Sequence, residues 1–509
     1  NEGPHTLDLD RMRYDDQRVL ELFRRGDTAG IFQFESGGMR KLLVDMQPDR
    51  LEDLIAANAL YRPGPMDLIP QYCARKHGRE EAPSVHPVVD RYTEETYGIM
   101  VYQEQVMQIV HNLGDIPLRE AYTLIKAISK KKHKVIDEMR PKFIGGAKEK
   151  GLSDKQANEL FDLILKFAGY GFNKSHSTGY AIIAYQTAYL KTYFPNQYMA
   201  ALLTFESAAR KVQAWAPYLE DCKQTRFIDH TDVSPHVGVE VRPPDINLSQ
   251  KDFSVVFNDD EPRDALHGHV RFGLGAIKGA GSAAIDAMIS ERDTNGPFKS
   301  IFDFCERVST RACNKATLES LVNCGAFDSL HGVEQRAAVF EAIDDAIRAG
   351  QAAAEDRAAG QMNIFAMGGE EQAPETPNGT QSDRPLPSVP PWPRMQMLQR
   401  EKETLGFHVS GHPLDEHERT LSRFCNATMA GLQDAVNEKQ IAMGCVLASI
   451  RFTTVKRGAS AGEKMAMVTL QDKTGTVDGV IFADVFKRVA AHLHEDAVVV
   501  IVGRVDRSR

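Results

Sequence analysis

The sequence predicts a multidomain protein that is mainly α-helical and ends in a small β-barrel of the OB type. Three observations lead to this prediction. The chain has 509 residues, far more than a single hydrophobic core can organise. Apolar residues recur at helical spacing up to about residue 212. From residue 439 onward the pattern changes to short strands with Gly-containing turns and one intervening helix.

Changes in composition divide the chain into five parts. The first, residues 1–212, is a long helical domain, and the second, residues 213–365, mixes short strands with a compact helical region. Residues 366–392 are rich in Pro, Gly and acidic side chains and predict a disordered linker. Residues 393–438 are predicted to form a helical connector, and residues 439–509 form the barrel, which we expect to be incomplete.

The overall composition is that of a globular protein and argues against several classes. The formal net charge is −9, so the chain does not coat nucleic acid through its overall charge, although this does not exclude local basic surfaces. The seven cysteines are odd in number and lack C-x-x-C spacing, which gives no support for a disulfide framework or a zinc site. No run reaches the ~18 apolar residues of a membrane span, and no signal-peptide pattern is present. We therefore expect a cytoplasmic protein without a membrane partner.

Two predicted helices flank the stretch GYGFNKSHSTGY at residues 169–180. In the first helix, Ser153 and Gln156 have capping-box spacing, and Gly169 is placed to end it in a left-handed conformation. The second helix carries apolar residues at helical spacing until Pro195. The polar residues between the two helices therefore lie in a tight hinge.

Four polar side chains gather in this hinge, directly before the second helix. They are Asn173, Lys174, Ser175 and His176. Unpaired N–H groups and the positive dipole end at a helix start favour an anion, and Lys174 and His176 add donors. A phosphate-bearing ligand is one interpretation. In the other, Ser175 or Ser177 merely caps the helix and Lys174 is solvated.

A basic run follows the helix predicted in LREAYTLIKAIS. It comprises Lys130, Lys131, Lys132, His133 and Lys134. Such a run is either a local nucleic-acid contact or a solvated helix end that the C-terminal dipole favours. The residues alone leave both interpretations open.

A glycine-rich stretch, VRFGLGAIKGAGSAAI, follows a predicted strand. Its glycines lack the G-x-G-x-x-G spacing of a dinucleotide site, and it has no G-K-[ST]. A better description is a hairpin turn in which Gly279 and Gly281, next to Lys278, let backbone N–H groups approach a ligand. Such a hairpin, near residues 271–290, resembles the helix-hairpin-helix motif, which grips the phosphate backbone of duplex DNA. A purely structural turn is the alternative.

The segment GQMNIF stands at the edge of the predicted linker. Its large apolar residues, Ile364 and Phe365, do little for folding at that place. Together with Gln361 they indicate a short peptide that folds into a partner's pocket. The alternative is a chain end tucked against its own domain.

Two carboxylates near the N-terminus, Asp8 and Asp10, raise the question of a metal site. Asp15 and Asp16 follow at the start of a helical run. Close carboxylates in such places more often cap helices and stay solvated, so we expect caps rather than metal ligands.

Several long strings occur together along the chain. They are GDTAGIFQFESGGMRKLL (26–43), ALYRPGPMDLIPQY (59–72), RKHGRE (75–80), TYGIMVYQEQVMQIV (96–110), FAGYGFNKSHSTGYAIIAYQTAYLKTYFP (167–195), PPDIN (243–247), GLGAIKGAG (273–281) and ETLGFHVSGHPL (403–414). In these strings and in their order the chain resembles the bacterial DNA polymerase III alpha subunits, the C family of replicative DNA polymerases. The resemblance covers almost the whole chain.

This resemblance implies roles for the five parts and for single residues. Residues 1–212 become a fingers domain, residues 213–365 a clamp-binding domain with the helix-hairpin-helix, and residues 439–509 an OB domain near the single-stranded template. The implied nucleotide-binding residues are Tyr170, Asn173, Lys174, His176 and Lys126, with Tyr170 against the base or sugar and Lys174 and His176 on the triphosphate. The implied DNA-binding residues are Lys130, Lys131, Lys132, Lys278, Gly279 and Gly281. The implied clamp-binding residues are Gln361, Met362, Asn363, Ile364 and Phe365.

The chain departs from the family's pattern in two respects. Where the family has two adjacent basic residues that reach the nucleotide, this chain has Ile125 and Lys126, so the first contact is lost or supplied elsewhere. The family's three metal-binding aspartates belong to a palm domain that precedes the fingers, and nothing in residues 1–25 resembles it.

The second departure shapes the expected function. The resemblance implies that the Mg²⁺ ions are held outside this chain, that the chain is an interior piece of a DNA-directed DNA polymerase, and that it does not extend a primer by itself. The implied partners are primer–template DNA, dNTP, the sliding clamp (beta subunit) and other replicase holoenzyme subunits. The alternative is a stand-alone, non-catalytic scaffold that binds DNA and tethers the clamp.

Overall fold

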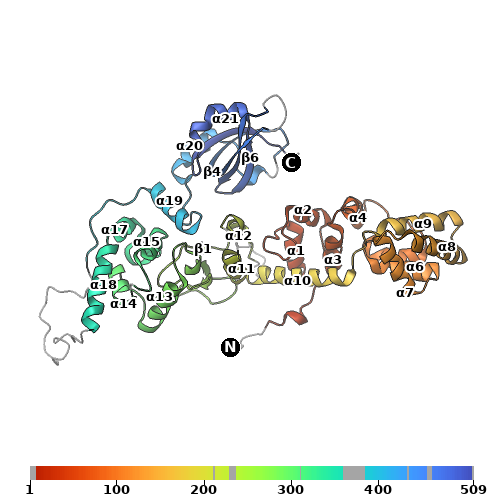
Figure 1. Cartoon of the computed structure of the whole chain (residues 1–509), viewed down its shortest axis with the longest axis horizontal. Helices are drawn as coiled ribbons and strands as arrows, with labels where there is room; N and C mark the ends of the chain where they lie inside the picture. Colours follow the sequence, from red (N-terminus) through yellow and green to blue (C-terminus); the bar gives the residue numbers. More distant parts are fainter. Residues whose placement is uncertain are drawn as a thin grey trace. The chain divides into compact units, whose positions relative to one another are not determined.

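The chain is mainly helical, as the sequence predicted, with a small sheet in mid-chain and a larger one near the C-terminus (Figure 1). This computed structural model describes residues 7–209, 212–227, 237–309, 311–358, 384–432, 435–455 and 461–506. None of the helices described is both long enough and apolar enough to cross a membrane. The chain forms two compact units, residues 1–198 with 225–238 and residues 199–224 with 239–509.

The first unit contains two hydrophobic cores. One lies among α1–α4 and α10, and the other among α5–α9. The helices are α1 (Gln17–Arg25), α2 (Gly37–Met46), α3 (Leu51–Leu60), α4 (Ile69–Lys76), α5 (Pro87–Thr93), α6 (Gln103–Gly114), α7 (Leu118–Ser129), α8 (His133–Glu149), α9 (Asp154–Ala168) and α10 (Lys174–Tyr193). The long helix α10 packs against α1 and α3 (Figure 1). Its first residues bond to α6, so α10 joins the two halves of this unit.

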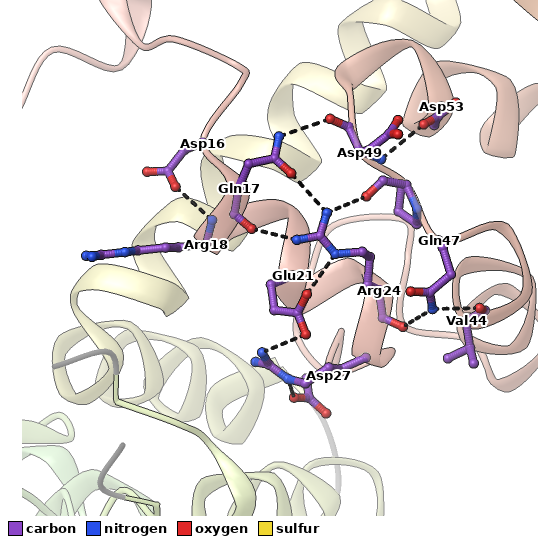
Figure 2. A network of polar contacts seen from close by, with 12 residues as sticks. Asp16, Gln17, Arg18, Glu21, Arg24, Asp27, Val44, Gln47, Asp49 and Asp53 are labelled. Atoms are coloured by element: carbon purple, nitrogen blue, oxygen red, sulfur yellow. Dashed lines mark hydrogen bonds and ion pairs between the residues drawn. The ribbon is translucent and has the colours of Figure 1, made fainter. Parts of the chain in front are cut away.

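A polar network around Arg24 ties α1 and α2 to the segment that leads into α3, as Figure 2 shows. The Arg24 guanidinium donates to the Glu21 carboxylate at 2.7 Å and to the carbonyl of Pro48 at 3.2 Å. It also donates to the side-chain oxygen of Gln17 at 3.0 Å, while the Gln17 amide donates to the carbonyl of Asp49 at 3.1 Å. The network therefore holds the segment before α3 against α1.

Helix starts in this unit follow the predicted capping residues. Ser153 and Gln156 form the reciprocal capping box of α9. Asp8 caps the 3-10 helix Leu9–Arg11, and Asp16 caps α1 by accepting from the N–H of Arg18. The N-terminal carboxylates Asp8 and Asp16 therefore act as caps, as predicted.

The predicted end of α9 is wrong in one detail. Gly169 follows the helix with φ −67° and ψ −24°, a right-handed conformation rather than a left-handed one. The N–H of Tyr170 donates to the carbonyl of Phe167 at 2.9 Å, which continues the chain in a tight right-handed turn. The residue type alone allowed either hand.

The second unit starts within α11 (Pro195–Ala209) and combines helices with a small mixed sheet. The sheet has the order β1-β3-β2, in which β1 (Val241–Arg242) is parallel and β2 (Ser254–Val256) antiparallel to β3 (His269–Arg271). The helices are α12 (Val212–Gln224), α13 (Ser282–Asn295), α14 (Ile301–Arg307), α15 (Lys315–Asn323), α16 (Asp328–His331), α17 (Arg336–Glu341), α18 (Ile343–Ala358), α19 (Arg394–Leu405) and α20 (Glu418–Phe424). Strands and helices thus occur in the order that the sequence predicted.

Aromatic rings from distant segments meet in this unit. Trp215 of α12 lies 5.4 Å from Phe407 between ring centroids, and Phe253 lies 4.5 Å from Phe272. Phe272 and Phe407 are 5.7 Å apart, which closes the cluster. Phe407 belongs to the predicted helical connector, so the connector docks on the small sheet through this cluster.

The end of the predicted linker makes contacts of its own. Residues 384–393 form neither helix nor strand, but the ring of Trp392 lies 5.5 Å from that of Phe340. The Arg400 guanidinium lies 4.1 Å from the Trp392 ring centroid. Residues 366–383 of the predicted linker lie outside the described residues.

The C-terminal sheet is antiparallel, with the order β6-β5-β4-β7. Its elements are β4 (Gln440–Thr454), β5 (Lys464–Asp472), β6 (Gly475–Ile481), α21 (Ala483–Val489) and β7 (Val498–Arg504). Met443, Cys445 and Leu447 alternate along the buried face of β4. In the part of the chain that the structure describes, β6 and β7 are edges that do not pair with each other, so the predicted barrel is present as an open OB-type sheet.

The two compact units cut across the predicted domain division. The break after residue 198 lies within α11, ahead of the predicted boundary at residue 212, and residues 225–238 return to the first unit. The limits predicted for the clamp-binding domain, linker, connector and OB domain fall inside the second unit. These limits therefore stay predictions.

Candidate functional site

Main-chain bonds fix the hinge before α10 to the start of α6. The N–H of Phe172 donates to the carbonyl of Val101 at 3.1 Å, and the N–H of Gln103 donates to the carbonyl of Phe172 at 2.9 Å. The Gln103 side chain adds a bond to the carbonyl of Gly171 at 2.9 Å. The hinge is therefore a defined platform and not a loose connection.

Asn173 begins α10. Its side-chain oxygen accepts from the N–H of His176 at 2.8 Å, which makes Asn173 the N-cap. Ser175 lies within the helix, and the buried Ser177 donates its hydroxyl to the carbonyl of Ile55 at 2.7 Å. The interpretation in which Ser175 or Ser177 caps the helix is therefore wrong, because Asn173 already holds that position.

A carboxylate of the chain itself occupies the N-terminal end of α10. Both oxygens of Glu104, in the first turn of α6, accept from the N–H of Lys174, at 3.1 and 3.0 Å. The Asn173 side-chain amide donates to the same carboxylate at 2.9 Å. The helix end attracts an anion, as its dipole predicts, and in this structure that anion is Glu104.

The side chain of Lys174 is paired as well. Its Nζ lies 2.7 Å from Oε2 of Glu95, and the two side chains are 35% and 33% exposed. It also lies 5.4 Å from the ring centroid of Tyr102. Burial raises the pKa of Tyr102 well above its ordinary value, so this ring stays neutral under the cation. Because the ion pair is partly open to solvent, an external anion can compete for Lys174.

Tyr170 presents its ring to solvent beside the loop before α4. The side chain is 53% exposed, and its ring packs on Gly64, where a Cβ would lie 2.6 Å from the ring. Gly64 has a φ of +101°, so both its conformation and this contact require glycine. Arg62 donates from Nη2 to the carbonyl of Tyr170 at 2.9 Å, and partial burial lowers the pKa of Arg62 while leaving it a cation.

His176 is exposed and lies among aromatic rings. Its ring centroid is 5.6 Å from that of Phe172 and 4.4 Å from that of Tyr180. Arg62 lies over the other end of this group, with its guanidinium carbon 4.3 Å from the Phe172 centroid. The hinge therefore brings Tyr170, His176 and Arg62 together through Phe172.

Lys126 lies on α7, whereas the other predicted nucleotide-binding residues lie in the hinge or at the start of α10. Its Nζ lies 4.3 Å from the ring centroid of Tyr122 on α7. Among the described residues no hydrogen bond or ion pair joins Lys126 to Tyr170 or Lys174. Ile125, which stands where the family has a basic residue, is buried in the core of α5–α9. A charged side chain at position 125 would therefore be desolvated on this backbone.

The basic run after α7 is exposed. Lys130 forms the C-cap of the helix, and Lys131 takes a left-handed conformation with φ +51°. For Lys130, Lys131 and Lys132 no side-chain ion pair is present in the described part of the chain. Three unpaired cations close together suit both earlier interpretations, the helix-end dipole and an external polyanion.

The glycine hairpin after β3 is a tight turn that packs on α15. Gly279 has a φ of +90°, and a Cβ there would lie 2.5 Å from Oγ of Ser320. Its carbonyl accepts from the hydroxyl of Thr317 at 3.1 Å. Gly281 caps α13 with ordinary φ and open space around it, and the side chain of Lys278 is exposed. The turn requires Gly279, whereas Gly281 leaves room for a ligand at the start of α13.

The remaining predictions concern metals and the clamp. No group of three or more His, Cys, Asp or Glu side chains that could hold a metal ion lies within the described ranges. The part of the chain that the structure describes therefore offers no such cluster for a Mg²⁺ ion. All seven cysteines are free, and all but Cys425 are buried. The predicted clamp motif, residues 361–365, lies outside the described residues.

Sequence reasoning missed four residues of this site. Glu95 and Glu104 pair with Lys174 from positions 79 and 70 residues earlier, so no local pattern indicated them. Arg62 and Gly64 lie in the string ALYRPGPMDLIPQY, whose place beside Tyr170 only the fold shows. The paired prolines around Gly64 were the one available signal of an unusual turn.

Three family models match parts of the chain. A model described as "Bacterial DNA polymerase III alpha subunit finger domain" matches residues 1–151. One described as "Helix-hairpin-helix motif" matches residues 238–338, and one described as "OB-fold nucleic acid binding domain" matches residues 449–509. The hinge around Lys174 lies outside all three matched ranges.

Curated relatives match nearly the whole chain. DNA polymerase III subunit alpha of Thermus aquaticus is 37% identical over 507 residues, which are 98% of this chain and 38% of that protein. The protein of the same name from Escherichia coli strain K12 is 35% identical over 511 residues, 99% of this chain and 41% of that protein. The one from Saccharopolyspora erythraea is 37% identical over 514 residues, 98% and 40% of the two chains. The chain thus spans about two fifths of the length of these relatives.

Three family models along the chain, together with this identity over almost all of its length, show the relationship. The chain belongs to the family of bacterial DNA polymerase III alpha subunits.

Proposed function

We propose that the chain supplies the nucleotide-handling and DNA-binding part of a replicative DNA polymerase, which adds dNTPs to the 3′ end of a primer on a template. The observation that carries this proposal is the hinge before α10, where Tyr170, Lys174 and His176 stand on a fixed platform. Catalysis of phosphoryl transfer depends largely on positioning and charge neutralisation, which such a hinge can supply. The Mg²⁺ ions of the reaction are assigned to residues outside this chain, so we expect the chain alone to bind DNA without extending a primer.

In this proposal the triphosphate replaces carboxylates of the chain. A phosphate oxygen takes the place of Glu95 at Nζ of Lys174, and His176 contacts the triphosphate from the same first turn of α10. While Glu104 accepts from the N–H group of Lys174 at the start of α10, its carboxylate repels the phosphates. It must therefore move aside when the triphosphate binds. Tyr170 packs against the base or sugar. The site thus offers a positive charge to the triphosphate only when the carboxylates of Glu95 and Glu104 are displaced.

The DNA contacts in this proposal come from two basic surfaces. Lys130, Lys131 and Lys132 carry unpaired charge after α7, and the helix-hairpin-helix turn offers Lys278 with the N–H groups around Gly281. Such contacts go to phosphates and do not depend on base sequence. Other replicase subunits and a cytoplasmic location belong to the same proposal.

Neutralising the basic run tests the DNA-binding part of the proposal. Changing Lys130, Lys131 and Lys132 together to Gln is expected to weaken primer–template binding about tenfold near 50 mM salt. The decline of log affinity with log salt should become less steep by up to about 3, since each phosphate contact contributes roughly 0.9 to the steepness. Fluorescence anisotropy with a labelled duplex across a salt series measures both quantities.

The control for that experiment is a pair of lysines that already have partners. Lys148 lies 3.0 Å from Asp154 and Lys155 lies 3.9 Å from Glu159, so Lys148→Gln with Lys155→Gln should change the salt slope little. An equal loss in the control and in the triple variant would show that only the net charge matters, and the basic run would lose its assigned role.

The clamp-binding part of the proposal rests on the sequence GQMNIF. Gln361→Ala with Phe365→Ala is expected to weaken binding to the sliding clamp at least tenfold, because a short docking peptide depends on a few anchor side chains. Surface plasmon resonance on immobilised clamp gives this affinity, and DNA binding by the same variant should stay within twofold of the wild type. Clamp affinity that survives both changes would remove the motif from the interface.

A further inference from the structure

A continuous row of aromatic rings crosses the surface of the first unit. This aromatic row consists of Phe172, His176, Tyr180 and Phe32, whose neighbouring ring centroids are 5.6, 4.4 and 5.2 Å apart. His176 and Tyr180 lie one helical turn apart on α10, while Phe172 comes from the hinge and Phe32 from the loop between α1 and α2. Arg62 lies over Phe172 at one end. Three segments that are distant in the sequence, at Phe32, at Arg62 and at residues 172–180, thus contribute to one surface.

The outward position of Phe32 is built into its loop. Its neighbours Ile31 and Phe34 are buried in the core, and Phe34 packs edge-on against Phe23 at 5.5 Å. Gln33 takes a left-handed conformation with φ +65°, which costs free energy for a non-glycine residue. Phe32 itself remains 36% exposed. The loop therefore keeps a strained backbone conformation at Gln33 while the large apolar ring of Phe32 stays at the surface.

Bonds to α10 hold this loop in place. The buried Nζ of Lys191 donates to the carbonyls of Asp27 and Ala29, at 3.1 and 2.9 Å. The N–H of Phe32 donates to the hydroxyl of Thr187 at 3.4 Å. Because both partners lie on the helix that carries His176 and Tyr180, the loop and the rest of the aromatic row are positioned as one piece. A surface that is fixed before binding loses little conformational entropy on binding.

The chemistry of the aromatic row favours nucleobases. Aromatic side chains with an adjacent arginine are the usual surface on which unpaired bases stack, because every base offers a π-face and Arg adds a cation–π contribution. One nucleotide covers about one ring, and the resemblance places the incoming nucleotide at Tyr170, Lys174 and His176. Phe32 and Tyr180 extend the surface beyond that position. We propose that Phe32 and Tyr180, the end of the aromatic row beyond His176, bind unpaired bases of the template strand ahead of the primer end; this deepens the proposed function and rests on it.

Base stacking can be separated from phosphate binding by the DNA used. The full 509-residue chain is titrated with primer–template DNA whose template overhang carries normal bases, and with the same DNA whose overhang is abasic. The wild type is expected to bind the first about tenfold more tightly than the second. Phe32→Ala with Tyr180→Ala should lose that preference while its affinity for the abasic DNA stays unchanged. Tyr180→Phe, which keeps the ring, should retain the preference.

Controls make each outcome decisive. Phe205→Ala removes an aromatic ring that is 75% exposed elsewhere, and it should keep the preference for bases. Circular dichroism confirms that the double variant is folded. A wild type that binds both DNAs equally, or a double variant that keeps the preference, overturns the proposal, and a protein partner would then be the better occupant. A wild type that binds neither DNA contradicts the proposed function instead.

Discussion

Replacing Lys174 by alanine is expected to weaken dNTP binding about tenfold while primer–template affinity stays within twofold. A charge-assisted hydrogen bond contributes about 1.5–3 kcal/mol, and about 1.4 kcal/mol corresponds to a factor of ten. We expect the lower end of that range, because Lys174 is partly exposed to solvent and gives up its bond to Glu95 when it binds phosphate. Calorimetric titration of a dNTP into the complex of the chain with primer–template DNA measures the change.

Neighbouring variants show whether the loss is specific to the hinge. Lys166→Ala removes an exposed lysine of α9 and should leave dNTP affinity unchanged. Glu95→Gln and Glu104→Gln remove the two carboxylates that compete with phosphate, so each is expected to strengthen dNTP binding. If dNTP affinity is the same in Lys174→Ala as in the wild type, Lys174 does not belong to the nucleotide site.

Local patterns in the sequence were enough to predict most of the fold. The capping box at Ser153 and Gln156 sets the start of α9, and the strand pattern that begins at residue 439 predicted the C-terminal sheet in which β4 lies. Whether the backbone of Gly169 takes a left-handed or a right-handed conformation could not be predicted in the same way. It depends on where the next residues bond, and Phe172 bonds to Val101, about seventy residues earlier in the chain. The open edges of the C-terminal sheet likewise depend on which strands pair with each other, and the pattern of residues along each strand does not determine that pairing.

The candidate site was predictable to the extent that its residues are adjacent in the sequence. Tyr170, Lys174 and His176 stand within seven positions, and the physics of a helix start indicated an anion there. That the anion is Glu104 follows only from the packing of α6 against the hinge. Ile125 is buried in the core of α5–α9, which explains the departure from the family at this position. Contacts between residues far apart in the sequence are therefore the part of the site that the sequence alone does not predict.

Replacing Arg336 by alanine is expected to loosen α19 from the helices that it packs on, at a cost of about 3–5 kcal/mol. Arg336 is 3% exposed and Glu401 of α19 is fully buried, with 2.7 Å between their charged atoms. Asp328 binds the same guanidinium at 2.6 Å. Burial alone would lower the pKa of Arg336, but the two carboxylates outweigh it and hold that pKa above its ordinary value. Without the guanidinium, Glu401 would keep a buried charge whose remaining hydrogen bonds, within the described ranges, come from the N–H groups of Val409 and Ser410.

Hydrogen exchange at the amides of α19 is the appropriate measurement, because a chain of several domains does not unfold in one step. Arg348→Ala is the matched control, since Arg348 is exposed, pairs with Asp345 on α18, and should change stability by less than about 0.5 kcal/mol. Adding Glu401→Leu to Arg336→Ala removes the stranded charge and should restore part of the protection. If α19 exchanges no faster in Arg336→Ala, the charge cluster is not what attaches this helix. The attachment would then lie with Phe407 and the aromatic cluster, where Phe407→Ala should produce the loss instead.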